Sequence, residues 1–492
     1  MFESAEVGHR LDKRTYEREV PLLREALLEA QWAVHQDGRF PVIVLIGGVD
    51  GAGKGETVNT LNEWMDPRHI RTVAFDGSTE EESERPRMWR YWRELPRQGQ
   101  IGIYFGSWYT DPIVDRVWGK TGKKALELEI ERINHFERML ADEGALILKF
   151  WFHLDKHSQR KRLEKIDADP VMSWQVTRAD WQQFKRYDRY YAVAEHTLRL
   201  TSAGHAPWVV VEGRDARYRQ YTVGSALLAA IRKQLEQPPA APASGVALPE
   251  LPADGRNVLN QLKLDRKLGE RKYARELAGL QGDLNQLARS KKFRARSVIC
   301  AFEGMDAAGK GGAIRRVTAA LDARQYRIIP IAAPTDEERA QPYLWRFWRH
   351  LPRRGRFTLY DRSWYGRVLV ERVEGFCQPA DWQRAYAEIN QFEQELVDAG
   401  GILCKFWLQV SQDEQLRRFR EREETGFKRF KITEDDWRNR EKWPRYEVAA
   451  AEMIERTSTA IAPWTLVEAE DKNWARVKVL RTLVERIETA LD

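Results

Sequence analysis

Short apolar runs alternate with longer amphipathic stretches along the chain. In the second half the apolar runs cover residues 298–302, 357–360, 402–408 and 464–467, and stretches with helical spacing cover 381–397 and 413–424. Apolar runs this short, separated by helices, are typical of a parallel sheet covered by helices on both faces. The pattern therefore predicts an α/β fold.

The same pattern occurs twice, in one register. The sequence GVDGAGKG at 48–55 returns as GMDAAGKG at 304–311, which is 256 positions later. At the same spacing WRYWR at 89–93 returns as WRFWR at 345–349, and the tripeptides SWY at 107–109 and KFW at 149–151 return as well. Several segments that repeat in one register indicate a duplicated domain.

A stretch rich in proline and alanine separates the two copies. It begins with QPPAAPASG at 237–245 and extends to about residue 256. Such a composition does not form a packed regular element and is typical of a linker. We expect one domain at 1–236, the linker at 237–256 and a second domain at 257–492.

The composition narrows the setting in which the chain works. A formal net charge of +7 and a pI near 9.1 favour polyanionic partners, although a well-solvated basic surface would give the same values. The three cysteines, at 300, 377 and 404, match neither a zinc site nor a disulfide framework, so we expect reduced thiols and a cytoplasmic location. The apolar runs are too short for a membrane span, and the first ten residues do not form a secretory signal, so we expect no membrane partner.

A glycine-rich loop follows the first apolar run of the second domain. Its pattern, Gly304-x-x-x-x-Gly309-Lys310 between a strand and a helix, is a P-loop in its usual context. Such loops turn backbone N–H groups toward an anion at the N-terminus of a helix. The predicted phosphate-binding residues are Gly304, Ala307, Ala308, Gly309, Lys310, Gly311 and Gly312.

Two carboxylates accompany this loop. Asp306 lies inside it, and Asp361 follows the strand at 357–360, where many P-loop proteins hold Mg²⁺. Gly311 stands where those proteins carry the serine or threonine hydroxyl that contacts the metal. We predict that Asp306 and Asp361 hold Mg²⁺, with Mn²⁺ as the other candidate ion, and that Lys310 and Arg362 bind phosphate. In the alternative interpretation, Asp306 caps the loop backbone and Asp361 with Arg362 forms a surface pair.

A basic cluster in the second domain resembles a lid. Lys428, Arg429 and Lys431 follow a helical stretch that carries Arg417 and Arg418, and closure of such a segment would exclude water from bound phosphates. A solvated charged face is the alternative, because acidic residues also gather here. With the lid, the fold class becomes a tandem pair of P-loop kinase-like domains, each with a parallel sheet flanked by helices and a helical lid.

The first copy lacks several parts of this site. By the 256-residue register, Asp361 and Arg362 correspond to Phe105 and Gly106, although Lys54 matches Lys310. Phosphoryl transfer depends on positioning and on charge neutralisation, so the first domain should be inactive. We expect it to be structural and to make the chain an intramolecular pseudo-dimer; further association into a homo-oligomer stays open.

At these residues the chain resembles the polyphosphate kinase 2 family. The loop from Gly304 to Gly312 is similar to that family's Walker A motif, and Asp361-Arg362-Ser363-Trp364-Tyr365 is similar to its Walker B motif. The tandem form resembles the two-domain class, whose members transfer phosphate from inorganic polyphosphate to AMP and release ADP. The resemblance implies catalytic roles for Asp306, Lys310, Asp361 and Arg362, and a lid role for Lys428, Arg429 and Lys431.

Other activities stay open on sequence grounds. A polyphosphate-dependent kinase with ADP or GDP as acceptor would carry the same motifs. An ATP-dependent nucleoside monophosphate kinase of the thymidylate-kinase type fits less well, because Gly311 has no hydroxyl. A non-catalytic module that binds polyphosphate or RNA has no need of the acidic pair, so we expect polyphosphate and AMP or ADP, and no nucleic acid, as partners.

Overall fold

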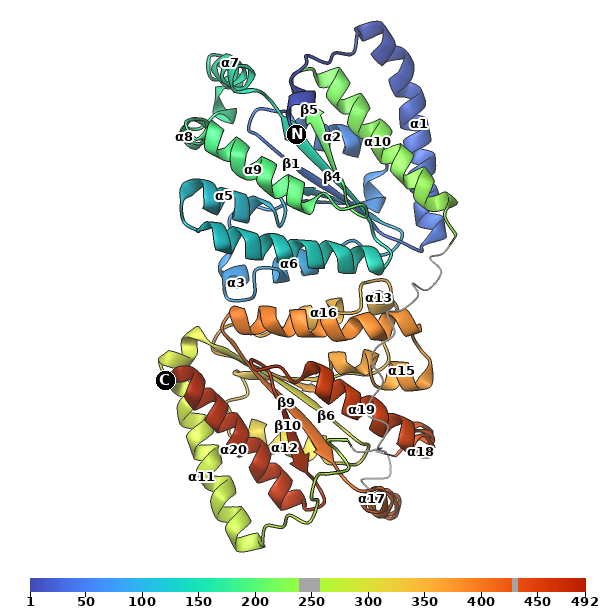
Figure 1. The fold of residues 1–492 in the computed structure, drawn as a ribbon, viewed down its shortest axis with the longest axis vertical. Helices are drawn as coiled ribbons and strands as arrows, with labels where there is room; N and C mark the ends of the chain where they lie inside the picture. The colour runs from blue at the N-terminus through green and yellow to red at the C-terminus, as the bar shows by residue number, and fades with distance from the viewer. Residues whose placement is uncertain (239–256, 427–431) are drawn as a thin grey trace. The chain divides into compact units, whose positions relative to one another are not determined.

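Each half of the chain contains a five-stranded parallel sheet in the computed structural model, which describes residues 1–238, 257–426 and 432–492 (Figure 1). The first sheet has the order β2-β3-β1-β4-β5 and contains β1 (Val42–Gly48), β2 (Ile70–Ala74), β3 (Ile101–Phe105), β4 (Leu146–His153) and β5 (Trp208–Glu212). The second has the equivalent order β7-β8-β6-β9-β10 and contains β6 (Ser297–Gly304), β7 (Tyr326–Pro330), β8 (Phe357–Asp361), β9 (Gly401–Gln409) and β10 (Trp464–Glu468). The predicted α/β class and the duplication are thus confirmed.

Helices cover both faces of each sheet (Figure 1). In the first half, one face carries α1 (Lys13–Asp37), α2 (Lys54–Trp64) and α10 (Ala216–Glu236), and the other carries α5 (Thr110–Trp118), α6 (Lys123–Asp142) and α9 (Tyr187–Thr201). In the second half, α11 (Glu270–Arg289), α12 (Lys310–Thr318) and α20 (Lys472–Leu491) lie on one face, and α16 (Pro379–Asp398) and α19 (Trp443–Thr457) lie on the other.

Shorter elements connect these layers. The remaining helices are α3 (Glu80–Ser83), α4 (Trp89–Arg93), α7 (Lys156–Asp167), α8 (Arg178–Phe184), α13 (Asp336–Arg339), α14 (Trp345–Trp348), α15 (Val370–Glu374), α17 (Gln412–Glu424) and α18 (Glu434–Glu441). The 3₁₀ turns are η1 (Glu3–Ala5), η2 (Pro67–His69), η3 (Ser173–Gln175), η4 (Lys292–Ala295) and η5 (Trp364–Arg367).

The central strands of the second sheet form its core. In β6 and β9 nearly every residue is buried, because helices cover both sides of the sheet. Cys300 and Cys404 lie opposite each other in these two strands as buried free thiols. Trp348 and Trp364 are also buried, which fits core packing.

Strand β7 was missed by the sequence pattern. It lies at the edge of the sheet, its residues are exposed or half-buried, and it includes Arg327 and ends at Pro330. An edge strand buries only part of its surface, so it needs no continuous apolar run.

The chain divides into two compact units that follow the two halves closely. The first unit also includes Thr335–Trp345, and the second also includes Thr79–Trp89. The domain limits of 1–236 and 257–492 remain a prediction. Among the described residues, no helix combines the length and apolar character needed to cross a bilayer.

Candidate active site

The glycine-rich loop of the second unit joins β6 to α12. Gly304 ends the strand at φ 142°, and a Cβ there would lie 2.4 Å from the carbonyl oxygen of Leu408, so only glycine fits. Gly309 caps α12 at φ 111°, and Lys310 begins the helix and folds back so that its Nζ donates to the Gly304 carbonyl at 2.7 Å. The seven predicted phosphate-binding residues therefore lie together in this loop and the first turn of α12.

The two predicted carboxylates both act on this lysine. Burial and the charge of Arg362 lower the pKa of Lys310, and the charges of Asp306 and Asp361 oppose that shift. Asp361 ends β8, whose residues pair with β6, and its Oδ2 lies 3.8 Å from the position of a Cβ on Gly311. Asp306 and Asp361 thus face one small region above the carboxyl ends of β6 and β8.

Asp306 is held by side chains rather than by the loop backbone. Its Oδ1 accepts from Nη2 of Arg362 at 3.0 Å, and its Oδ2 accepts from Nδ2 of Asn439 at 2.9 Å. Burial opposes ionisation of this carboxyl, but the charges of Lys310 and Arg362 outweigh it and keep its pKa below the usual value. Both oxygens of Asp306 therefore bond to side chains, whereas a loop cap would accept from backbone N–H groups.

Arg362 adopts a left-handed backbone conformation with φ 64°, and Ala307 does the same with φ 61°. Each non-glycine residue in this region costs about 1–2 kcal/mol. In the first unit the equivalent positions are Gly51 and Gly106, at φ 75° and 76°. The second unit therefore has a strained backbone at two positions where the first has glycine, and such strain gathers at functional sites.

A buried carboxylate, Glu303, lies beneath the loop and was not found from the sequence. It is 5% exposed, and its Oε1 accepts from the hydroxyl of Ser363 at 2.7 Å. Burial raises the pKa of Glu303, and the Ser363 hydrogen bond and the charges of Lys310 and Arg362 oppose that shift. The equivalent residue in the first unit is Gly47, and a comparison of the two halves at this position is the signal that could have revealed Glu303.

Helix α18 reaches the loop through Asn439, another residue that sequence analysis missed. The hydroxyl of Tyr446 donates to Oδ1 of Asn439 at 3.1 Å, and Glu374 accepts from Lys442 at 2.7 Å and from Arg438 at 3.2 Å. In the first unit Trp118 replaces Glu374, and the guanidinium of Arg186 stacks on it at 3.8 Å. Lys428, Arg429 and Lys431, the predicted lid cations, lie outside the described residues.

Arg418, which the sequence placed on the approach to the lid, is buried beneath the loop instead. It is 3% exposed and donates to the carbonyls of Ala307 and Ala308 at 3.0 and 3.1 Å. A second branch donates to the carbonyl of Ala469 at 2.6 Å. Arg418 thus fixes the loop conformation from below.

A buried ion pair anchors the segment that follows Asp361. Nζ of Lys405 donates to Glu393 at 2.7 Å and to the hydroxyl of Tyr365 at 2.9 Å, and the indole of Trp364 donates to Glu393 at 3.0 Å. The first unit keeps this arrangement with Lys149, Glu137, Tyr109 and Trp108. Since the first unit has this arrangement without an equivalent of Asp361, it supports the fold of the loop rather than the chemistry.

The equivalent loop in the first unit is occupied by its own side chains. Lys54 donates to the Gly48 carbonyl at 2.6 Å, as Lys310 does, but Phe105 stands in place of Asp361. Glu56, on the first turn of α2, forms an ion pair with Arg219, whose guanidinium would lie 2.1 Å from a Cβ on Gly53. Glu56 also pairs with Arg162 at 2.7 Å, so side chains of the first unit bond to one another at this helix N-terminus.

The donor set of the second unit fits a divalent ion. Asp306 and Asp361 offer hard oxygen ligands beside the phosphate-binding loop, which is the ligand type that Mg²⁺ prefers. Among the described residues no group of three or more acidic, histidine or cysteine side chains is placed to hold a metal alone. A site with few protein ligands suits an ion that keeps several waters and binds substrate phosphates.

A parallel sheet with a P-loop at its carboxyl edge and an acidic residue on the adjacent strand defines a P-loop phosphotransferase. The family model of polyphosphate kinase 2 matches residues 10–239 and 267–492, and the chain belongs to this family, whose kinases generally use a divalent metal ion.

The chain is 56% identical over 491 residues to the polyphosphate:AMP phosphotransferase of Pseudomonas aeruginosa, with 100% of this chain and 99% of the relative covered. A protein of the same name from Pseudomonas syringae pv. tomato is 54% identical with the same coverage. A crystal structure described as a polyphosphate kinase 2 from Pseudomonas aeruginosa superposes with a TM-score of 0.91 at 55% identity and covers 100% of this chain and 99% of its own.

Proposed function

We propose that the chain transfers the terminal phosphoryl group of inorganic polyphosphate to AMP and releases ADP. The observation that carries this proposal is the pair of carboxylates, Asp306 and Asp361, whose charges both act on Lys310 in the second unit. The first unit has Phe105 in place of Asp361. The names of the full-length relatives support polyphosphate as donor and AMP as acceptor.

The side chains of the second unit suit the transfer of a phosphoryl group between two anions. A phosphate oxygen of AMP is already negative, so attack on the terminal phosphorus of polyphosphate needs no strong general base. The reaction needs cations that bring the two anions together and neutralise the loose transition state. Lys310 and Arg362 supply fixed positive charge, and the loop N–H groups orient the phosphates. A Mg²⁺ held by Asp306 and Asp361 would supply further charge neutralisation.

Asp306 also orients Arg362. Arg362 is half-exposed and rests on Oδ1 of Asp306. Its remaining guanidinium donors are available for a phosphate in a planar fork. The strained backbone at Arg362 aims this fork across the loop, so that one residue links the acidic pair to the substrate.

We further propose that the first unit is structural. It has Phe105 in place of the second carboxylate, and the guanidinium of Arg219 lies against Gly53 of its loop. It would then stand in for a second subunit, as in a dimer of two identical domains.

A product assay tests this function. The full chain with Mg²⁺ and polyphosphate is offered AMP, ADP, GMP or GDP in turn, without ATP, and the nucleotides are resolved. Formation of ADP from AMP, abolished by EDTA, is the expected result. A phosphorylated product from ADP or GDP alone would assign the chain to diphosphate acceptors, and activity that needs ATP as donor would overturn the proposal.

A further inference from the structure

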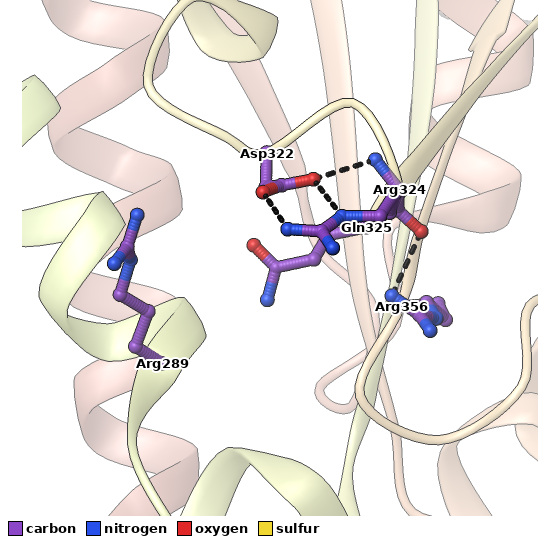
Figure 2. Close-up of a pocket in the computed structure, with 5 residues that line it drawn as sticks. All are labelled: Arg289, Asp322, Arg324, Gln325 and Arg356. Carbon is purple, nitrogen blue, oxygen red and sulfur yellow. Dashed lines mark hydrogen bonds and ion pairs between the residues drawn. The ribbon is translucent and has the colours of Figure 1, made fainter.

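A pocket lined by three arginines lies at the end of the second sheet opposite the P-loop (Figure 2). Arg289 ends α11, Arg324 lies in the turn before β7, and Arg356 immediately precedes β8, so all three lie at the amino ends of the strands. Asp306 and Asp361 lie at the carboxyl ends of the same parallel strands. The pocket is therefore separate from the candidate active site.

The pocket is held together by defined contacts. Asp322 accepts from Nε and Nη2 of Arg324 at 2.9 and 2.7 Å, and hydrogen bonds from the side chain and backbone N–H of Arg324 keep the pKa of Asp322 well below its usual range. Arg356 donates to the carbonyl of Arg324 at 2.7 Å, and the amide of Gln325 donates to the carbonyl of Ala288 at 3.1 Å. In Figure 2 the side chain of Arg289 lies beside its helix, apart from Asp322, Arg324 and Gln325.

Positive charge exceeds negative charge here. Asp322 neutralises one arginine, whereas Arg289 has neither a hydrogen bond nor an ion pair among the described residues, and Arg356 bonds only to a carbonyl there. The loop from α11 to β6 adds further exposed cations, Lys291, Lys292, Arg294 and Arg296, and contains no acidic residue. It lies against the loop before β8, because Gly355 donates to the carbonyl of Arg296 at 2.6 Å.

The equivalent strand ends of the first unit carry fewer of these cations. Its turn keeps the pair of Asp66 and Arg68, but Ala33 and Gln100 stand in place of Arg289 and Arg356. Arg39, in its equivalent of the basic loop, is bound to Asp37. Since the fold forms without them, the added cations in the second unit are not needed for folding, and unpaired like charges repel one another unless an anion joins them.

We propose that this arginine pocket binds a distant part of the polyphosphate chain whose end occupies the P-loop. The inference rests on polyphosphate as the donor. A long polyphosphate chain carries negative charge along its whole length, so a distant part of it can bind the arginine pocket. Such binding raises the effective concentration of the chain end at the P-loop and adds no contact at the reacting phosphorus. A short chain cannot reach both ends of the sheet and gains nothing.

The test compares long-chain with short-chain polyphosphate on the full protein. In the variant Arg289→Gln/Arg356→Gln we expect the KM for long chains to rise about tenfold, with kcat and the KM for short chains unchanged. The matched control is Arg68→Gln/Arg97→Gln, which removes two arginines from the equivalent end of the first unit and should leave every constant unchanged. An unchanged long-chain KM, an equal rise for both chain lengths, or the same rise in the control would overturn the proposal.

Direct binding separates polyphosphate from nucleic acid. Long-chain polyphosphate should still bind the variant Lys310→Ala, and this binding should fall when Arg289→Gln and Arg356→Gln are added. If single-stranded RNA loses affinity with these changes and polyphosphate does not, the pocket belongs to RNA and the proposal is wrong. Activity on short-chain polyphosphate tests the proposed function separately. If that function failed, the unaltered protein would have no such activity; if only the pocket proposal failed, the unaltered protein would keep it.

Discussion

Nη2 of Arg362 donates to Oδ1 of Asp306 at 3.0 Å, which joins the predicted phosphate-binding cation to a predicted metal ligand. The two residues follow different strands, β6 and β8, so this bond ties the two strand ends together. The carboxylate therefore holds the arginine over the loop, and the arginine helps to keep the carboxylate ionised.

The acidic pair can be tested one residue at a time. Asp306→Asn and Asp361→Asn should each lower kcat at least 10²- to 10³-fold, because each removes charge that positions the divalent ion at the transferred phosphate. Steady-state rates of ADP formation measure this. Asp50→Asn, at the equivalent of Asp306 in the first unit, is the matched control and should keep near-normal activity. A comparable loss in Asp50→Asn would mean that the first loop also works.

The strained backbone at Arg362 makes a prediction about stability. Arg362→Gly and Arg362→Ala both remove the guanidinium, so both should lose activity. The glycine variant should be more stable than the alanine variant by about 1 kcal/mol, because only glycine adopts this φ without strain. Urea unfolding of the two variants measures the difference.

The reverse change in the first unit provides the control. Gly106→Ala should be destabilised, since its Cβ would lie 2.8 Å from the carbonyl oxygen of Phe75 as well as adopting a left-handed φ. Equal stability of Arg362→Gly and Arg362→Ala would show that no strain is stored at this residue.

The buried ion pairs should matter equally in both units. Lys405→Met leaves the carboxylate of Glu393 buried without its partner, which should cost about 3–5 kcal/mol of stability, and Lys149→Met should do the same to Glu137. Adding Glu393→Gln to Lys405→Met should restore part of the loss, because it removes the uncompensated charge. Denaturant unfolding detects each change, and a loss of stability in only one of the two variants would show that the pairs do not stabilise both units alike.

His153 gives the first unit a pH dependence of its own. It is 1% exposed, and burial lowers its pKa below 6.5 despite its contact with Glu6 at 2.7 Å. The unfolded chain then binds a proton more readily than the folded one, so stability should fall as pH drops below about 6.5. The unfolding midpoint at several pH values measures this effect.

The second unit carries Gln409 at the equivalent of His153 and suggests the control. His153→Gln should weaken the fall in the midpoint between about pH 6.5 and pH 5. An unchanged pH profile in this variant would assign the effect to other groups.

Sequence periodicity predicted the central strands and the phosphate loop, because buried strands and a glycine-rich turn leave strong local patterns. It missed β7, whose edge position leaves its side chains half-exposed. It also missed Glu303 and Asn439, since their roles depend on contacts with Ser363 and Asp306 from distant elements. Arg418 was assigned to the approach to the lid because a basic run resembles a segment that closes over phosphates, yet this side chain donates to the loop carbonyls and is buried.

The glycines at positions 51 and 106 suggest how the two copies of a duplicated enzyme diverge. A copy that does not catalyse the reaction is under no selection to keep a backbone conformation that costs stability, so substitutions to glycine can accumulate at such positions. Wherever tandem kinase domains share one framework, side chains forced into left-handed geometry would mark the half that still does the work.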